Sequence, residues 1–218
     1  MFYNVLQAAF TLMSSFILLH VISFFKVNCM IGAGTAYFSG VNIVGPLLGA
    51  WYGLAGAASI LGARVVFKSI FNNMVFTPLV YHIPNICAAS YWMPGKRALK
   101  IAIPAVCMIL FLVHPVGIQA WFYTSFWLIP MALSLVPGRS LFLTALGSTF
   151  TAHAVGSVLW LYWIPMAPET FALLMPIVPF ERLAYASGMV MIEKSRQAFW
   201  GAFKKMQVSQ QYAATISR

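Results

Sequence analysis

Long apolar runs alternate along this chain with short stretches that contain proline, glycine and single basic residues. An α-helix needs about 20 mostly apolar residues to cross the hydrocarbon core of a bilayer, and shorter runs can cross beside other helices. By that measure the pattern predicts membrane spans at 5–25, 45–63, 76–93, 98–114, 118–136, 141–164 and 168–191. The small, moderately apolar stretch 32–44 could form a short helix, a re-entrant segment or a loop. We therefore expect an all-α polytopic membrane protein, a bundle of six or seven transmembrane helices.

The composition agrees with a chain whose solvent is lipid. Hydrophobic residues make up 61% of the 218 residues, charged residues make up only 7%, and the mean hydropathy is +0.86. A soluble domain keeps its surface in water with about a quarter of its residues charged. The acidic residues are Glu169, Glu181 and Glu193, and no aspartate occurs. We expect an integral protein of the cell membrane, whether this is called the inner or the plasma membrane.

The basic residues favour one orientation in that membrane. The net charge is +10, but the basic residues are scattered between apolar runs, so they do not indicate a nucleic-acid partner. Cytoplasmic loops retain Lys and Arg. The basic positions in 96–100, Arg139 and the tail at 194–205 are two predicted crossings apart, so all three fall on one side and predict a cytoplasmic C-terminus. Arg64 and Lys68 fall on the outer side in this scheme, against the rule.

Two regions are expected on this basis, a transmembrane helical domain over 1–193 and a basic cytoplasmic tail over 194–218. Apolar and basic side chains recur in the tail at helical spacing: Phe199, Phe203 and Met206, with Lys204 and Lys205. This pattern is typical of an amphipathic helix that lies on the inner surface of a membrane.

Glycines recur at helical spacing in the second predicted span. Gly45, Gly49 and Gly53 are four residues apart, Gly56 follows, and Pro46 lies near the helix start, where its missing N–H costs nothing. No hydrophobic force drives helices together in lipid, so close backbone approach at small residues matters more there. The four glycines predict a helix-packing face.

A small, basic, six-span chain with a Gly-Pro-x-x-Gly-x-x-x-Gly run, here Gly45 to Gly53, resembles the substrate-binding S components of energy-coupling-factor (ECF) vitamin transporters. The resemblance implies an S-component-like bundle that binds a small vitamin-like substrate. It also implies a transmembrane coupling subunit and ATPase subunits as partners. The chain itself has no phosphate-binding loop, so any use of ATP would come from a partner.

The first helix of that family commonly carries an Ala-x-x-x-Ala face that docks on the coupling subunit. That pattern is absent here, because Leu12 follows Ala8 at the corresponding spacing. Ala8, Thr11 and Ser15 form a small-residue face that could serve the same close approach. Packing of this helix within the chain explains the same face equally well.

Aromatic and polar residues gather near the expected outer ends of the spans. A pocket for a small ring-bearing metabolite needs flat apolar walls and a few hydrogen-bonding groups. Trp and Tyr also anchor helices at membrane interfaces, which is the alternative interpretation. The candidate substrate-binding residues are Asn72, Asn73, His114, Gln119, Trp121, Tyr123, His153, Trp160, Trp163 and Glu169.

Ionisable residues inside spans form a second candidate site. His153 and Glu181 are 13 and 15 residues from the turn centred near Met166, so they are expected at similar depth, and Arg182 is adjacent to Glu181. Charge inside a bilayer is costly unless it is paired. An intramembrane cluster of His153, Glu181 and Arg182 could clip two helices together, or it could handle substrate or protons.

Catalysis is not indicated by the remaining residues. Cys29, Cys87 and Cys107 lie far apart with no Cys-x-x-Cys pair, and the four histidines are widely separated. Without aspartate no Ser-His-Asp set is possible, and we expect no enzyme activity, no metal and no cofactor. The function classes left open are a substrate-binding transporter subunit, a non-transporting membrane scaffold or assembly protein, and a proton-coupled carrier that uses Glu181 and His153.

Overall fold

A computed structural model describes residues 2–24, 26–28, 37–72 and 77–216, with side chains over 12–24, 39–71, 81–203 and 205–206. The elements are α1 (Phe2–Ile22), β1 (Lys26–Asn28), β2 (Tyr37–Ser39), α2 (Val41–Asn72), α3 (Thr77–Ala89), η1 (Ser90–Trp92), α4 (Arg97–Val113), α5 (Pro115–Gln119), η2 (Trp121–Trp127), α6 (Leu128–Leu135), α7 (Leu141–Trp163), α8 (Pro168–Leu174) and α9 (Ile177–Ile216). Apart from the short antiparallel pair of β1 and β2, the described elements are helical. The all-helical class predicted from the sequence is confirmed.

Two described helices are long and apolar enough to cross a membrane, Val41–Phe71 and Leu141–Trp163. This weakly supports insertion into a bilayer. The expected six or seven crossings stay a prediction.

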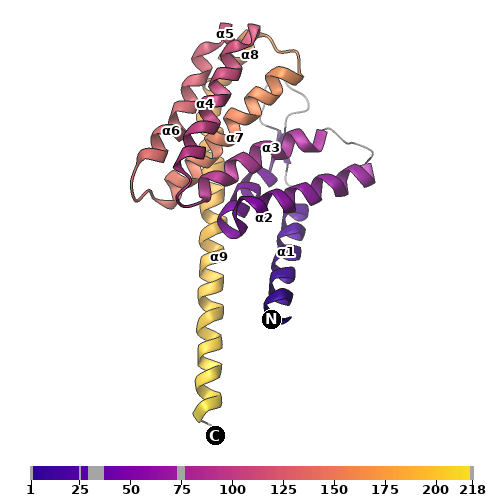
Figure 1. Ribbon diagram of the computed structural model, residues 1–218, viewed down its shortest axis with the longest axis vertical. Coiled ribbons are helices and arrows are strands. Elements are labelled where there is room, and N and C mark those ends of the chain that lie inside the picture. Colours follow the sequence, from indigo (N-terminus) through magenta and orange to yellow (C-terminus); the bar gives the residue numbers. More distant parts are fainter. Residues whose placement is uncertain (1, 25, 29–36, 73–76, 217–218) are drawn as a thin grey trace.

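Helix α7 forms the centre of the bundle and packs against α3, α4, α6 and α9 (Figure 1). Its start is fixed by Ser140, whose Oγ accepts a hydrogen bond from the backbone N–H of Leu143 at 3.2 Å. Around it lies an aromatic core in which Phe111 contacts the rings of Trp127 and Phe171 at 5.1 and 5.0 Å between centroids. These buried rings hold α4, η2 and α8 together on one side of α7.

Helix α2 is kinked at Gly53, which has φ 69° and ψ −178°. This backbone region is open almost only to glycine. The expected glycine face therefore does not run unbroken along the helix. Gly45 and Gly49 approach α3 closely, since a Cβ at Gly49 would collide with the carbonyl of Ala89. A Cβ at Gly53 would meet nothing, and one at Gly56 would meet only the side chain of Tyr52 in its own helix.

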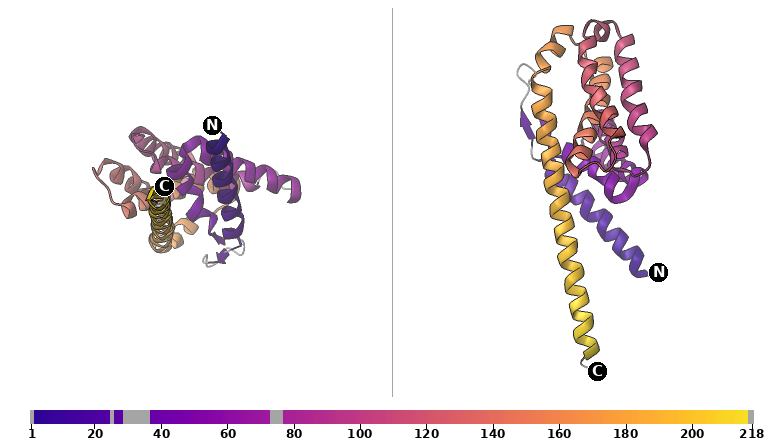
Figure 2. Two further views of the ribbon diagram at one scale, coloured as in Figure 1. Left: turned by 90° about the horizontal axis from the view of Figure 1, so that it is seen from below. Right: turned by 90° about the vertical axis from the view of Figure 1, so that its left-hand side faces the viewer.

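The last predicted span, 168–191, is divided into two helices. Helix α8 ends at Leu174 and α9 begins at Ile177, so the break lies at Pro176, which lacks the N–H that a continuous helix requires. Helix α9 then continues to Ile216 without a break at the expected domain boundary after 193. The tail is the C-terminal part of α9. It continues along the axis of this helix and projects away from the bundle (Figures 1 and 2).

Helix α1 contacts α2, and its N-terminus points toward the same end of the molecule as the C-terminus (Figure 1). Ser15 is buried, and its Oγ lies 2.6 Å from the hydroxyl of Tyr52 in α2. In this structure Ser15 thus packs within the chain. The side chains of Ala8 and Thr11, the other members of the expected docking face, lie outside the described residues.

Candidate functional site

A cavity of about 460 Å³ lies between α7, α8 and α9, with α2, α3 and η2 closing its sides. One end of the cavity is formed by the turn between α7 and α8, where Pro165 and Met166 line it. Pockets that bind small molecules usually have volumes of about 300–1,000 Å³. The cavity is thus large enough for one small metabolite.

Aromatic rings form one wall of the cavity. Tyr81 of α3 and Trp160 of α7 meet edge to face with their centroids 5.9 Å apart. Tyr123 of η2 is 1% exposed, and its ring contacts Phe171 and His153 at 5.0 and 5.3 Å. Because these rings are fixed by neighbouring rings, the wall offers flat, preorganised apolar surface.

Side-chain amides and a phenol join three helices beside this wall. The amide of Asn85 in α3 donates to Oδ1 of Asn42 in α2 at 3.1 Å, and to the carbonyl of Tyr81 at 3.2 Å. The amide of Asn42 donates in turn to the hydroxyl of Tyr185 in α9 at 3.4 Å. Oδ1 of Asn85 is buried and accepts no hydrogen bond from any described residue.

The charged residues of the cavity lie on α9. Glu181 Oε1 and Arg182 Nη2 form an ion pair at 2.6 Å, and the Arg182 guanidinium lies 4.9 Å from the ring centre of Tyr185. Since Glu181 and Arg182 are adjacent, their pair by itself joins no two helices. The link to α7 is a long bond of 3.3 Å from Arg182 Nη1 to the carbonyl of Thr149.

His153 lies on α7 and lines the same cavity without bonding to that ion pair. Its described neighbours are the rings of Tyr123, Phe126 and Phe150. Its Nε2 and the Nε of Arg182 are buried and have no hydrogen-bond partner among the described residues. Leaving a buried polar atom unpaired costs about 1–3 kcal/mol, so each of these two atoms carries such a cost in this structure.

Of the predicted substrate-binding residues, the structure places Tyr123, His153 and Trp160 on the cavity lining. His114 instead caps α5, where its Nδ1 accepts from the N–H of Val116, and its ring packs on Tyr162. The remaining described candidates lie outside the cavity lining and are exposed: Gln119, Trp121, Trp163 and Glu169. Asn73 and the side chain of Asn72 lie outside the described residues.

Among the lining residues that sequence reasoning did not place in the site are Asn42, Asn85 and Tyr185. The asparagines could have been found, because each stands within an apolar stretch where a polar side chain is expensive and therefore informative. Tyr185 carries no such signal. The described part of the chain brings no three His, Cys, Asp or Glu side chains together as potential metal ligands.

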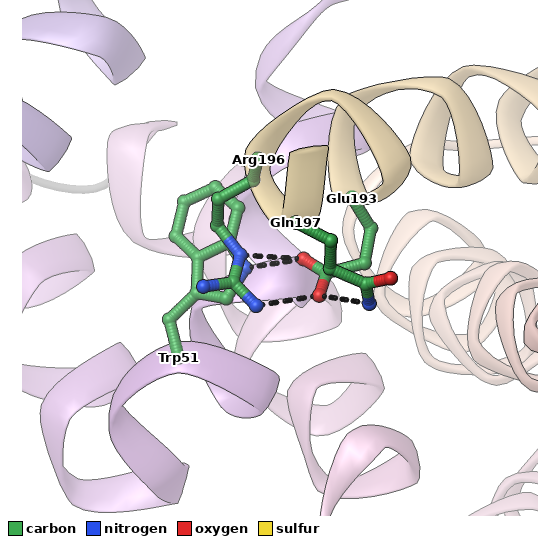
Figure 3. Close-up of polar contacts among 4 residues, drawn as sticks. All are labelled: Trp51, Glu193, Arg196 and Gln197. Carbon is green, nitrogen blue, oxygen red and sulfur yellow. Dashed lines mark hydrogen bonds and ion pairs between the residues drawn. The ribbon is translucent and has the colours of Figure 1, made fainter. Parts of the chain in front are cut away.

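A second polar cluster ties α9 to α2 where α9 leaves the bundle (Figure 3). The carboxylate of Glu193 accepts hydrogen bonds from Trp51 Nε1 at 2.7 Å, from Arg196 at 2.8 and 2.6 Å, and from Gln197 at 2.8 Å. Burial acts to raise the pKa of this carboxyl, but the hydrogen bonds and the charge of Arg196 outweigh burial and hold the pKa below its ordinary value of 4.5. We call these four residues the Glu193 clamp.

Comparison with known proteins gives no match: no family model, no curated protein and no solved structure matches this chain. The cavity combines an aromatic wall, balanced charges on Glu181 and Arg182, and three unpaired buried atoms. A concave apolar site with a few polar groups is the usual form of a small-molecule pocket.

Proposed function

We propose that this chain is a membrane-embedded substrate-binding subunit that captures a small, ring-bearing, vitamin-like metabolite. The observation that carries the proposal is the cavity of about 460 Å³ with its aromatic wall of Tyr81, Tyr123 and Trp160. Asn85, His153 and Arg182 line the cavity, and their polar side chains would supply the few contacts that orient a ligand.

Delivery into the cell would then depend on partner proteins, a transmembrane coupling subunit and ATPase subunits. This part of the proposal is supported by the resemblance of the Gly-Pro helix at Gly45 to Gly53 to the S components of ECF transporters, and by the lack of a phosphate-binding loop. The protein would lie in the cell membrane with its C-terminus in the cytoplasm, as the distribution of Lys and Arg favours. The turn between α7 and α8 would then open the cavity to the outside.

Purified full-length protein tests the binding step directly. Native mass spectrometry of the protein should detect a retained metabolite, and that metabolite can then be titrated by tryptophan fluorescence. Trp160→Ala should weaken its binding about tenfold or more, because losing an aromatic contact costs about 1.5 kcal/mol. Trp163→Ala is a matched control, since Trp163 lies on the same helix but does not line the cavity. Equal affinity of both variants would contradict a substrate site in this cavity.

A proton-coupled carrier is the second candidate, because Glu181 and His153 line one cavity. A carrier of this kind would need no ATPase. Proteoliposomes that contain only this chain would then accumulate the metabolite in response to an imposed pH gradient, and His153→Gln would abolish accumulation. Retained binding without such uptake would favour the partner-dependent subunit.

A further inference from the structure

Two cations gather on one buried tyrosine at the end of the bundle away from α8. Tyr91 of η1 is fully buried, and its hydroxyl donates to the carbonyl of Pro130 at 2.8 Å. The ring is packed so tightly on α7 that a Cβ at Gly147 would collide with it. Lys100 Nζ from α4 and Arg139 Cζ from the turn after α6 each lie 5.3 Å from the centre of this ring. The fixed ring thus brings cations from two separate segments to one place.

The charges of this pair are not balanced by the described part of the chain. Lys100 is 3% exposed, and its ammonium makes no hydrogen bond or ion pair with a described residue. Arg139 uses only Nη1, which donates to the carbonyls of Leu133 and Ser134 at 3.3 and 3.1 Å. Contact with an aromatic face contributes only about 0.5–2 kcal/mol per cation. The two cations therefore retain most of their capacity to bind an anion.

We propose that Lys100 and Arg139 bind a phosphate group, and that its source is the headgroup of an anionic phospholipid. The site lies among the basic loops that predict the cytoplasmic side, and anionic lipids are concentrated in the cytoplasmic leaflet. An arginine fork and a lysine point charge are the two usual partners of phosphate. The inference requires a bilayer, but it does not depend on the proposed transport function.

The test uses the full-length chain in nanodiscs of phosphatidylcholine with and without one fifth phosphatidylglycerol. After extraction into mild detergent, native mass spectrometry should show phosphatidylglycerol retained several-fold more than phosphatidylcholine. The double variant Lys100→Met, Arg139→Met should lose this preference. Arg97→Gln is the control, because Arg97 is an exposed cation at the start of the same helix, α4, and is not part of the proposed site; it should retain the preference.

Further measurements on the same preparations test the site and the source of the phosphate. Phosphatidylglycerol should raise the melting temperature of the wild type and of Arg97→Gln, but not that of the double variant, because only a bound ligand stabilises the folded state. If the double variant does not fold, Lys100→Met alone should still reduce lipid retention. Equal retention by the wild type and the folded variants would overturn the site. Displacement of the lipid by millimolar inorganic phosphate would overturn the lipid source in favour of a soluble anion.

Discussion

At the scale of single residues, the cavity is organised by polar atoms that folding has buried without full pairing. Asn85 Oδ1, His153 Nε2 and Arg182 Nε are all buried without a described partner, and all three residues line one cavity. Most buried polar groups in proteins are hydrogen-bonded, so three exceptions at one place need a reason. In the proposed function, these side chains turn toward a bound ligand, which then supplies the missing partners.

The ion pair of Glu181 and Arg182 gives a test at this scale. Glu181→Gln removes the charge that balances a largely buried guanidinium, and breaking such a pair costs about 3 kcal/mol where it is well buried. We expect a lower melting temperature, with metabolite binding reduced only in proportion to the loss of folded protein. Replacing both residues by Gln should recover part of the stability. A stable Glu181→Gln protein that no longer binds or transports would show instead that Glu181 acts on the substrate or on protons.

Single residues also show how much of the site the sequence could predict. His153 and Glu181 were expected at similar depth from their distances to the turn near Met166, and both line the cavity. The fixed rise per residue of a helix carries that information. The sequence does not distinguish the roles of Trp160 and Trp163. A tryptophan near a helix end can anchor the helix at the membrane interface or line a binding pocket. Only the rotation of α7 against its neighbours distinguishes the two.

At the scale of helices, the structure depends on where backbones approach and where they bend. Apolar length predicts that a helix exists, but it does not predict its breaks. The kink at Gly53 and the division at Pro176 both fall within single predicted spans. A glycine can serve a close contact or an unusual dihedral angle, and the sequence does not distinguish these roles.

Gly49 provides a test of the close approach between α2 and α3. Gly49→Ala places a Cβ against the backbone carbonyl of Ala89, which cannot move as a flexible side chain would, so we expect a loss of about 1–3 kcal/mol from overpacking. Gly62→Ala is the matched control in the same helix. Its Cβ would meet nothing within 4 Å, and alanine favours the helix over glycine by about 0.5–1 kcal/mol. Thermal unfolding in detergent should separate the two variants, and equal melting temperatures would argue against the close contact.

The Glu193 clamp predicts how the attachment of α9 to α2 depends on pH. The folded pKa of Glu193 lies below 4.5, so the clamp contributes its full stability above that value and loses it as the pH falls through the folded pKa. We expect the melting temperature to fall in this acidic range.

Variants of the clamp identify the group that is responsible for this pH dependence. Glu193→Gln should be less stable than the wild type at neutral pH and should lose this part of the pH dependence. Trp51→Phe removes one donor of the clamp, and the apparent pKa of the transition should then move upward. A wild type and a Glu193→Gln variant with parallel pH profiles would show that the clamp contributes nothing.

At the scale of the whole molecule, α9 connects the features that the separate elements carry. It supplies Glu181 and Arg182 to the cavity, holds Glu193 against α2 and continues as the projecting basic tail (Figure 2). The two helical ends of the chain point in one direction, away from the turn between α7 and α8 (Figure 1). This arrangement separates the α7–α8 end of the cavity from the end with both termini. In the proposed function, the first end receives the ligand on one side of a membrane and the second meets the partners on the other.

The orientation of the molecule is the last prediction, and reporter cysteines can test it. Cys29, Cys87 and Cys107 are first replaced by Ala, and single cysteines are then introduced at Ser140, Ser195 or Ala167. The basic loops and tail predict that Ser140→Cys and Ser195→Cys face the cytoplasm. A membrane-impermeant maleimide should therefore modify neither of them in intact cells, and should modify both after permeabilisation. Ala167→Cys, in the exposed turn before α8, should react in intact cells and serves as the external control. Modification of Ser140→Cys from outside, with Ala167→Cys protected, would show that the orientation is the reverse of the predicted one and that the cavity faces the cytoplasm.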